Sequence, residues 1–380
     1  MTFDFYCDII NLYIINGGHI MKQTKKRASL IGVILFLIVI TFALSSRFFS
    51  KYDKASNNPI TSSKFSLDTI VTITVYNNED SKYVDKCFDI INKYDNMFST
   101  SKANSDISKI NTNPNKFVHV HKDTIEVLKS SIKTAQQTNG LFDPTIGKLT
   151  DLWNISELAK NAKNKNNEVS ANNIPSAEKI HSLVPHINYK NIKIQDDSVM
   201  LCDSNAKIDL GGIAKGYIAD KIKLYFNKCP LKNKAIINLG GNILTINKSS
   251  SDTFNIGIQK PFSATNSTIG KIKISNSSIV TSGIYERFFK CNNKIYHHIL
   301  NTSTGYPVDN NLEEVTIITP KSTTADALST SVFSMGLKNG KNYIESLKNT
   351  EAIFVTKDKK VYLTNGIKDF ELTDSAYTIQ

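Results

Sequence analysis

Closely spaced cysteines are missing from this sequence. Its 380 residues include five cysteines, and no two of them form a Cys-x-x-Cys pair. The spacing indicates neither a zinc site nor a dithiol redox centre, because both use cysteines a few residues apart. The cysteines are either buried thiols or members of disulfides whose pairing the sequence does not give, and we expect buried thiols. They are Cys7, Cys87, Cys202, Cys229 and Cys291.

A concentrated block of positive charge is also missing. The formal net charge is +12, but the lysines are spread through Asn-rich and Ser-rich stretches. A nucleic-acid-binding surface needs a clustered basic stripe with aromatic residues among the charges. Dispersed lysines are typical of a solvated surface, so we do not expect nucleic acid as a partner.

Near the start of the chain, a basic stretch at residues 22–27 precedes residues 28–44, which carry no charge. The apolar run is at the lower limit for a membrane-spanning helix and slightly long for the core of a signal peptide. It is therefore either a membrane anchor or a signal segment. No cysteine lies between Cys7 and Cys87, which excludes a lipid-anchored lipoprotein for this stretch.

These features divide the chain into four expected segments. Basic residues before an apolar run favour a cytoplasmic N-terminus, and Met21 has the character of a natural start. The segments are a cytoplasmic or upstream stretch at residues 1–27, the anchor or signal segment at 28–44, a polar linker at 45–63 and the main domain at 64–376.

In the main domain, strand and helix patterns do not alternate strictly. The irregular order favours an α+β fold with mixed or antiparallel sheets flanked by helices over a doubly wound sheet. Residues 154–174 are rich in Lys and Asn, and we expect a loop there. Alternating β-branched residues predict strands, and apolar residues at helical spacing predict helices. Strands are expected at 69–76, 188–201 (a pair), 235–239, 253–258, 270–274, 352–356 and 361–364, and helices at 81–97, 105–110 and 121–138.

A glycine corner is the first candidate site. Residues 206–210 read as a short strand, two glycines follow, and residues 213–226 have the spacing of a helix. The first turn of a helix presents unpaired N–H groups, which favour a phosphate. Lys215 would add a positive charge there, and Asp209 would hold a hydroxyl or a metal. The alternative is an ordinary strand-turn-helix corner, and the glycine spacing is neither the Rossmann fingerprint nor a P-loop.

A second candidate lies on the helix that begins near Thr323 and is expected to end at Gly336. Thr323 and Asp326 have the spacing of a capping box. The same geometry places oxygen atoms of Asp326, Ser329 and Thr330 on one helical face, and such ligands suit Mg²⁺. Both interpretations remain open on this evidence alone.

Two further polar positions have structural and functional alternatives. The neighbours His297 and His298 would point to opposite faces of a strand, so at most one faces a given site. Asp143 precedes a proline and either forms a turn or binds a hydroxyl.

Several of these stretches together resemble the FAD:protein FMN transferase family (ApbE-type flavin transferases). They occur in the family's order over roughly residues 65–336, and the ordered set is specific although each piece is modest. The matching stretches are Phe98-Ser99-Thr100, Ser105-Asp106-Ile107-Ser108 with Asn111, Gly140-Leu141-Phe142-Asp143-Pro144-Thr145, Asp209-Leu210-Gly211-Gly212-Ile213-Ala214-Lys215-Gly216-Tyr217, Asn238-Leu239-Gly240-Gly241-Asn242, Thr281-Ser282-Gly283, His298-Ile299, Thr304-Gly305-Tyr306-Pro307-Val308 and Ala325-Asp326-Ala327-Leu328-Ser329-Thr330.

The resemblance implies FAD as a substrate and Mg²⁺ as a cofactor. The implied flavin-binding residues are Leu67, Ser101, Leu141, Phe142, Asp143, Asp209, Lys215 and Leu300. The implied metal ligands are Gly212, through its carbonyl, Asp326, Ser329 and Thr330. Where the family has an aromatic residue this chain has Ser101, so we expect stacking on the flavin or adenine either to be weaker or to come from another ring, such as Tyr285 or Tyr306.

The resemblance implies phosphoryl transfer. A Thr or Ser hydroxyl of an acceptor redox protein would attack the FMN-side phosphorus of FAD, and AMP would leave. His298 is our candidate for assisting deprotonation of the hydroxyl, and Asp326 for acting through the metal. Two alternatives stay open: a Mg²⁺-dependent FAD pyrophosphatase, and a non-enzymatic flavin-binding surface protein. Tethering by the N-terminal helix would place the catalytic domain outside the cytoplasmic membrane.

Overall fold

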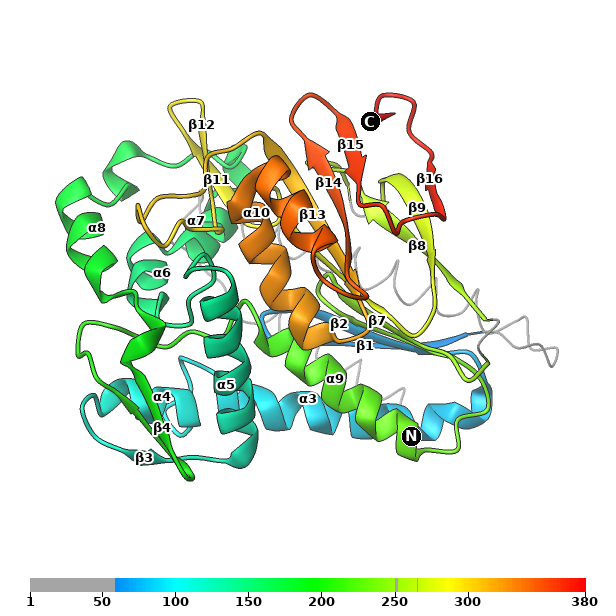
Figure 1. Cartoon of the computed structure of the whole chain (residues 1–380), viewed down its shortest axis with the longest axis horizontal. Helices are drawn as coiled ribbons and strands as arrows, with labels where there is room; N and C mark the ends of the chain where they lie inside the picture. Colours follow the sequence, from blue (N-terminus) through cyan, green and yellow to red (C-terminus); the bar gives the residue numbers. More distant parts are fainter. Residues whose placement is uncertain (1–58, 250–251, 265) are drawn as a thin grey trace, which may run out of the picture. The chain divides into compact units, whose positions relative to one another are not determined.

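The computed structural model describes residues 59–249, 252–264 and 266–380, which belong to one compact unit (Figure 1). The expected start at Met21, the anchor or signal segment at 28–44 and most of the linker lie outside the described residues. Within the described part of the chain, none of the helices combines the length and hydropathy that crossing a bilayer requires.

A nine-stranded sheet forms the centre of the fold, with the order β1-β2-β6-β7-β10-β13-β14-β15-β17. Its neighbouring strands are antiparallel except for the parallel pair β15 and β17. The predicted α+β class with a mixed sheet is therefore confirmed. The strands are β1 Ile60–Ser66, β2 Thr69–Val75, β6 Ala235–Leu239, β7 Asn242–Ile246, β10 Ser278–Gly283, β13 Leu312–Thr319, β14 Glu351–Thr356, β15 Lys360–Leu363 and β17 Thr378–Ile379.

Three smaller sheets and the helices surround it. The small sheets pair β3 Val118–His119 with β5 Ser198–Leu201 and β4 Ile192–Gln195, β16 Phe370–Leu372 with β9 Thr268–Ile274 and β8 Phe254–Gln259, and β11 Phe288–Cys291 with β12 Lys294–His297. The α-helices are α3 Val84–Phe98, α4 Asp106–Thr112, α5 Lys122–Gln137, α6 Gly147–Trp153, α7 Ile155–Ala162, α8 Ala177–Leu183, α9 Ala214–Lys228 and α10 Ser322–Glu345. The 3₁₀ helices are η1 Asn78–Tyr83, η2 Lys163–Lys165, η3 Ala171–Asn173, η4 Val184–His186 and η5 Tyr189–Asn191.

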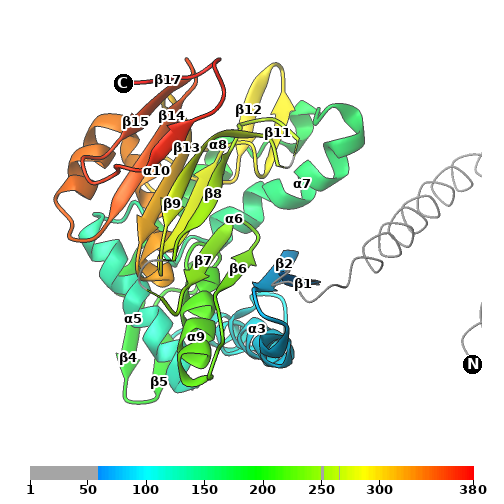
Figure 2. The ribbon, with the colours of Figure 1, turned by 90° about the vertical axis from the view of Figure 1, so that its right-hand side faces the viewer.

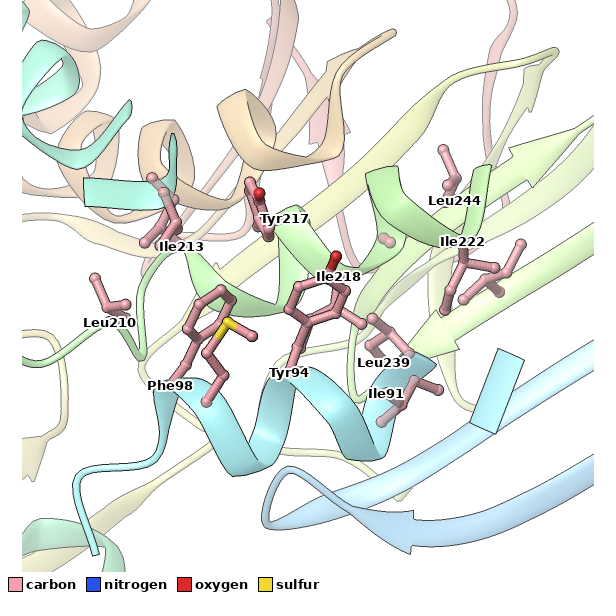
Figure 3. Close-up of a cluster of buried hydrophobic side chains, with 14 of the residues drawn as sticks. Ile91, Tyr94, Phe98, Leu210, Ile213, Tyr217, Ile218, Ile222, Leu239 and Leu244 are labelled. Carbon is pink, nitrogen blue, oxygen red and sulfur yellow. The ribbon is translucent and has the colours of Figure 1, made fainter. Parts of the chain in front are cut away.

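Helix α9 is held between the sheet and α3, and Figure 2 shows it running along β6 and β7. Its apolar side buries Ile218 and Ile222 against the core, as Figure 3 shows. Tyr217 meets the ring of Tyr94 from α3 edge-on, with centroids 5.7 Å apart. Burying each large side chain stabilises the fold by roughly 1.5–3 kcal/mol, so the start of α9 is fixed in position.

Helices α9 and α10 approach each other closely at Gly216. A side-chain carbon placed on Gly216 would lie 2.3 Å from the Ser322 carbonyl oxygen and 2.8 Å from Cβ of Asp326. Only glycine fits at this crossing. The first helical segment of α10 ends at Gly336, as predicted, where φ is 75°, and a second helical segment follows the kink as far as Glu345.

Three local predictions were wrong. Residues 206–210 do not form a strand and make only an isolated bridge between Lys207 and Ile146. The expected loop at 154–174 contains α7, whose Ile155 is buried against α6 and β11. The predicted linker ends early, because Ile60 already begins β1, where hydroxyl pairs such as Thr61 with Thr74 join the two strands.

The described cysteines agree with the expectation of buried thiols in most cases. Cys87, Cys229 and Cys291 are buried and Cys202 is half-buried, and none of these four forms a disulfide. Burial raises the pKa of the Cys87 thiol, so this group is unreactive at neutral pH.

Candidate active site

A cavity of about 410 Å³ lies where the predicted motifs meet. Its wall is formed by the β1–β2 turn, the end of α3, the turn before α6, the corner before α9, the β6–β7 turn, the end of β10 and the first turns of α10. The pairing of β7 with β10 ends at Asn242 and Val280, which leaves the rest of β10 facing this space. The cavity has the size of a typical cofactor site.

The glycine corner is part of the cavity wall and is fixed by Asp209. The Asp209 carboxylate accepts a hydrogen bond from the Gly211 N–H at 2.7 Å. Its own N–H donates to the Pro144 carbonyl at 2.7 Å. This hydrogen bond connects the glycine corner to the segment around Pro144, although the two are distant in the sequence.

Asp326 connects the start of α10 to the start of α9. Its Oδ2 accepts a hydrogen bond from the Gly216 N–H at 2.8 Å, and the residue is 4% exposed. The predicted capping box is wrong, because the first N–H groups of α10 donate to Asp220 instead, at 2.9 Å each. Asp326 is therefore free to face the cavity, and its Oδ1 has no hydrogen-bond partner within the described residues.

Gly212 and Thr330 lie beside Asp326. A side-chain carbon on Gly212 would lie 3.8 Å from Oγ1 of Thr330, so these two residues are neighbours in the cavity wall. The donor set, with one carboxylate, one hydroxyl and one carbonyl, consists of oxygen atoms, which Mg²⁺ prefers. The described residues contain no cluster of three or more His, Cys, Asp or Glu side chains suited to a metal. The residues present therefore fit Mg²⁺, which usually retains water molecules and substrate oxygens among its ligands. They do not fit a metal whose ligands all come from the protein.

Ser329 does not join this set. Its hydroxyl donates to the Asp326 carbonyl at 2.8 Å and accepts from Ser282 at 2.8 Å. It is 1% exposed and is not part of the cavity wall. Its hydroxyl connects α10 to β10 and is not available as a metal ligand.

The residues predicted to bind flavin all line the cavity. Leu67 lies in the β1–β2 turn, where both residues have positive φ, and Ser101 lies at the exposed rim. Leu141, Phe142 and Leu300 form an apolar wall.

Asp143 has mainly a structural role. Its carboxylate accepts hydrogen bonds from the N–H and hydroxyl of Thr145 and from the N–H of Tyr189. Burial raises the pKa of Asp143, and these hydrogen bonds oppose the shift.

The aromatic rings expected to stack on the ligand were wrongly chosen. Tyr285 points to the buried Glu314, and Tyr306 packs against Trp153, so neither lines the cavity. The rings at the cavity wall are those of Phe142 and, from α3, Tyr94 and Phe98. The sequence contained the signal in the helical spacing of α3, but that spacing does not distinguish a core ring from a cavity ring.

The two neighbouring histidines have different surroundings. His297 is buried, and its Nε2–H donates a hydrogen bond to the Val308 carbonyl at 2.9 Å. Burial lowers its pKa to about 4. His298 lines the cavity, where burial and the Arg287 charge hold its pKa well below the usual range. Its Nδ1 lies 3.3 Å from the Arg287 carbonyl oxygen. A carbonyl only accepts, so Nδ1 carries the proton and Nε2 is the basic nitrogen.

Three cavity residues were given no role from the sequence. Glu286 and Arg287 line the cavity with Lys215. Restricted hydration raises the pKa of Glu286 to about 6; the charges of Lys215 and Arg287 oppose this rise, and Asp326 adds to it. Asn242 is 1% exposed, and its Nδ2 has no hydrogen-bond partner within the described residues. Its Oδ1 accepts a hydrogen bond from the Ser322 hydroxyl at 2.8 Å, which fixes the orientation of the amide group.

The model of the ApbE family matches residues 67–354, a range that includes every element of this cavity. The chain belongs to the ApbE family. The resemblance inferred from the motifs is therefore confirmed.

Named relatives and solved structures agree with the family. The chain is 30% identical over 304 residues to the FAD:protein FMN transferase of Klebsiella pneumoniae, covering 79% of this chain and 90% of that protein. The FAD:protein FMN transferase of Treponema pallidum is 26% identical, with 80% and 86% covered.

Among ApbE structures, the ApbE protein of Thermotoga maritima superposes with a TM-score of 0.70 at 30% identity, covering 81% of this chain and 97% of that one. The flavin transferase ApbE of Vibrio cholerae has a TM-score of 0.67 at 20% identity, with 81% and 97% covered, and supports the fold alone.

Proposed function

We propose that this protein transfers the FMN part of FAD to a Thr or Ser hydroxyl of an acceptor protein and releases AMP. The single observation that carries the proposal is the 2.8 Å contact of the Gly216 N–H with Asp326, which brings a phosphate-favouring helix start and an oxygen-bearing helix into one cavity. The names of the relatives support the same reaction.

The cavity offers separate surroundings for the two parts of FAD. Leu141, Phe142 and Leu300 supply apolar contact for the isoalloxazine ring. The start of α9 and Lys215 supply N–H groups and a positive charge for the diphosphate.

In the proposed step, the acceptor hydroxyl oxygen forms a bond to the FMN-side phosphorus, and the bond from that phosphorus to the bridging oxygen breaks. His298 takes the hydroxyl proton at Nε2, because its low pKa keeps the ring neutral at pH 7. AMP leaves with the bridging oxygen, and Lys215 balances its charge. Asp326, Thr330 and the Gly212 carbonyl would hold Mg²⁺, which when bound neutralises charge on the diphosphate.

The test uses purified protein, FAD, Mg²⁺ and candidate membrane redox subunits, followed by in-gel flavin fluorescence. Wild type should label an acceptor and release AMP. Asp326→Ala should lower the rate on the order of 10²–10³-fold, because an electrostatic stabiliser is lost. Asp89→Ala, which removes an exposed carboxylate of α3, is the matched control and should keep the rate. Normal transfer by Asp326→Ala in limiting Mg²⁺ would contradict the metal assignment.

A second candidate reaction is hydrolysis of FAD to FMN and AMP. It is favoured by the opening of the cavity, because His298 is half-buried and water reaches its surroundings. Product analysis separates the two reactions: protein-bound FMN identifies the transferase, and free FMN with AMP identifies the pyrophosphatase. FAD binding without any AMP release would leave only a flavin-binding protein.

We also propose that the catalytic domain acts outside the cytoplasmic membrane, held by the apolar segment at residues 28–44. The proposal is supported by the basic residues that precede this segment, which lies outside the described residues. Protease added to intact cells should degrade the domain, and protection from protease would contradict this location.

A further inference from the structure

A buried carboxyl group lies behind the cavity wall. Glu314 is on β13, and its side chain is fully shielded from solvent. Its Oε2 accepts a hydrogen bond from the Tyr285 hydroxyl, and its Oε1 accepts one from the Thr316 hydroxyl at 3.2 Å. The proposed transfer reaction assigns this carboxyl group no role.

The hydrogen bonds continue from Glu314 to the cavity. Thr316 and Thr281 are direct partners in the pairing of β13 with β10, and their hydroxyl oxygens are 2.8 Å apart. Thr281 is half-buried and lines the cavity. We call Glu314, Thr316 and Thr281 the Glu314 relay.

The directions of these hydrogen bonds depend on one proton. When Glu314 is ionised it only accepts, so Thr316 donates to it and the oxygen of Thr316 accepts the proton of Thr281. Thr281 then presents only lone pairs to the cavity. When Glu314 is protonated, Tyr285 still donates to Oε2 and the new O–H on Oε1 donates to Thr316. Thr316 in turn donates to Thr281, whose proton is released toward the cavity.

We propose that Glu314 is a positioning residue that determines, through Thr316, whether Thr281 donates or accepts a hydrogen bond in the cavity. The diphosphate of FAD has only acceptor oxygens, and so do the carbonyl groups of its ring. The protonated form of the Glu314 relay is therefore the form that favours FAD. This inference rests on the proposed function for the identity of the ligand.

The surroundings of Glu314 shift the protonation of its carboxyl group toward neutral pH. Burial raises the pKa of Glu314 to about 8, the hydrogen bonds from Tyr285 and Thr316 oppose the rise, and the neighbouring carboxylates add to it. The titratable groups that interact with it are Tyr285 and Glu286 after β10, Glu313 on β13 and Tyr377 in the C-terminal segment. Lys357 and Lys359 act on the neighbouring Glu313. Near neutral pH, Glu314 is mainly protonated.

The experiment measures the Kd for FAD by flavin fluorescence from pH 6 to 9, with full-length protein and no acceptor. For wild type we expect Kd to rise by about tenfold or more above pH 8, because one hydrogen bond to a charged ligand is lost. Glu314→Gln should remove this rise. Its amide can accept from Tyr285 and must donate to Thr316, which reproduces the protonated form at every pH.

Two further variants test the other members. Thr281→Val should bind FAD weakly at every pH, without the rise. Tyr285→Phe removes a hydrogen bond that stabilises the ionised form, so the rise should move to higher pH. Thr319→Val is the matched control, because it removes another buried β13 hydroxyl, 3.3 Å from Thr350, that does not line the cavity.

A Kd profile shared by wild type and Glu314→Gln would overturn the inference. If Glu314→Gln does not fold, a wild-type profile in Thr281→Val would overturn it equally well. Failure of the proposed function has a different result: wild type would bind FAD with the expected pH profile and transfer no FMN to any acceptor.

Discussion

At the scale of single residues, two aspartates that line the same cavity have different roles. Asp143 has both carboxylate oxygens occupied by backbone and hydroxyl donors, whereas Asp326 has one oxygen unoccupied beside the cavity. The sequence predicted that both are polar positions in family motifs. It did not predict which carboxylate has a vacant oxygen, because that depends on N–H groups supplied by distant segments such as Tyr189 and Gly216.

The histidine pair gives the residue-scale prediction. His298→Gln should lower kcat for FMN transfer by about 10²–10⁴-fold, the usual contribution of a general base, with little change in the Kd for FAD. The low pKa of His298 keeps the base neutral, so the acidic limb of the wild-type rate should lie well below pH 6.5. Stopped-flow or discontinuous AMP assays measure the rate.

His297→Gln is the control for this prediction. Its ring is buried against Phe333 on the opposite face, so the folded variant should retain transfer. Equal losses of kcat in the two variants would indicate that the segment, rather than Nε2 of His298, is required.

At the scale of elements, α9 and α10 cap each other. Asp220 on α9 accepts the N–H groups of Ser322 and Thr323, and Asp326 on α10 accepts the N–H of Gly216. Sequence spacing predicted both helices, and for the start of α10 it offered a local capping box as one of two interpretations. The pairing between helices has no local signal, since its partners are about a hundred residues apart in the sequence.

The element-scale prediction concerns Asp220. Asp220→Ala removes the carboxylate that accepts hydrogen bonds from two backbone N–H groups and from the Thr323 hydroxyl. It should therefore lower the free energy of unfolding by about 1–3 kcal/mol. It should also weaken transfer, because the first turn of α10 carries Asp326. Urea unfolding and transfer assays measure the two effects.

The matched control is Ser176→Ala, which removes the ordinary cap of α8. It should cost about 1 kcal/mol and leave transfer unchanged, because α8 does not line the cavity. A stability loss without any loss of transfer in Asp220→Ala would show that the cap does not position Asp326.

At the scale of the whole molecule, the sequence predicted the α+β class and the helices α3, α4, α5, α9 and α10, but it predicted no strand for β7, β10 or β13 in the middle of the main sheet. It missed β1, an edge strand stabilised by hydroxyl pairs rather than apolar alternation. It missed α7 because this stretch is rich in Lys and Asn, and only Ile155 and Ala162 of the helix are buried. The sequence predicted the motifs that form the cavity, but it did not predict that Glu286 and Arg287 line it. Their position depends on where the pairing of β7 and β10 stops.

The same packing has a consequence for stability in acid. His297 has a folded-state pKa of about 4, against about 6.5 in the unfolded chain. Between these values the unfolded state binds a proton that the folded state does not, so the free energy of unfolding rises with pH. The contribution is complete above pH 6.5 and is lost as the pH falls toward 4, by about 3 kcal/mol in total. His297→Gln should therefore show a smaller loss of stability than wild type over this interval in urea unfolding at fixed salt. An equal loss in both proteins would assign the acid sensitivity to carboxyl groups and not to this buried ring, whose Nδ1 has no partner within the described residues.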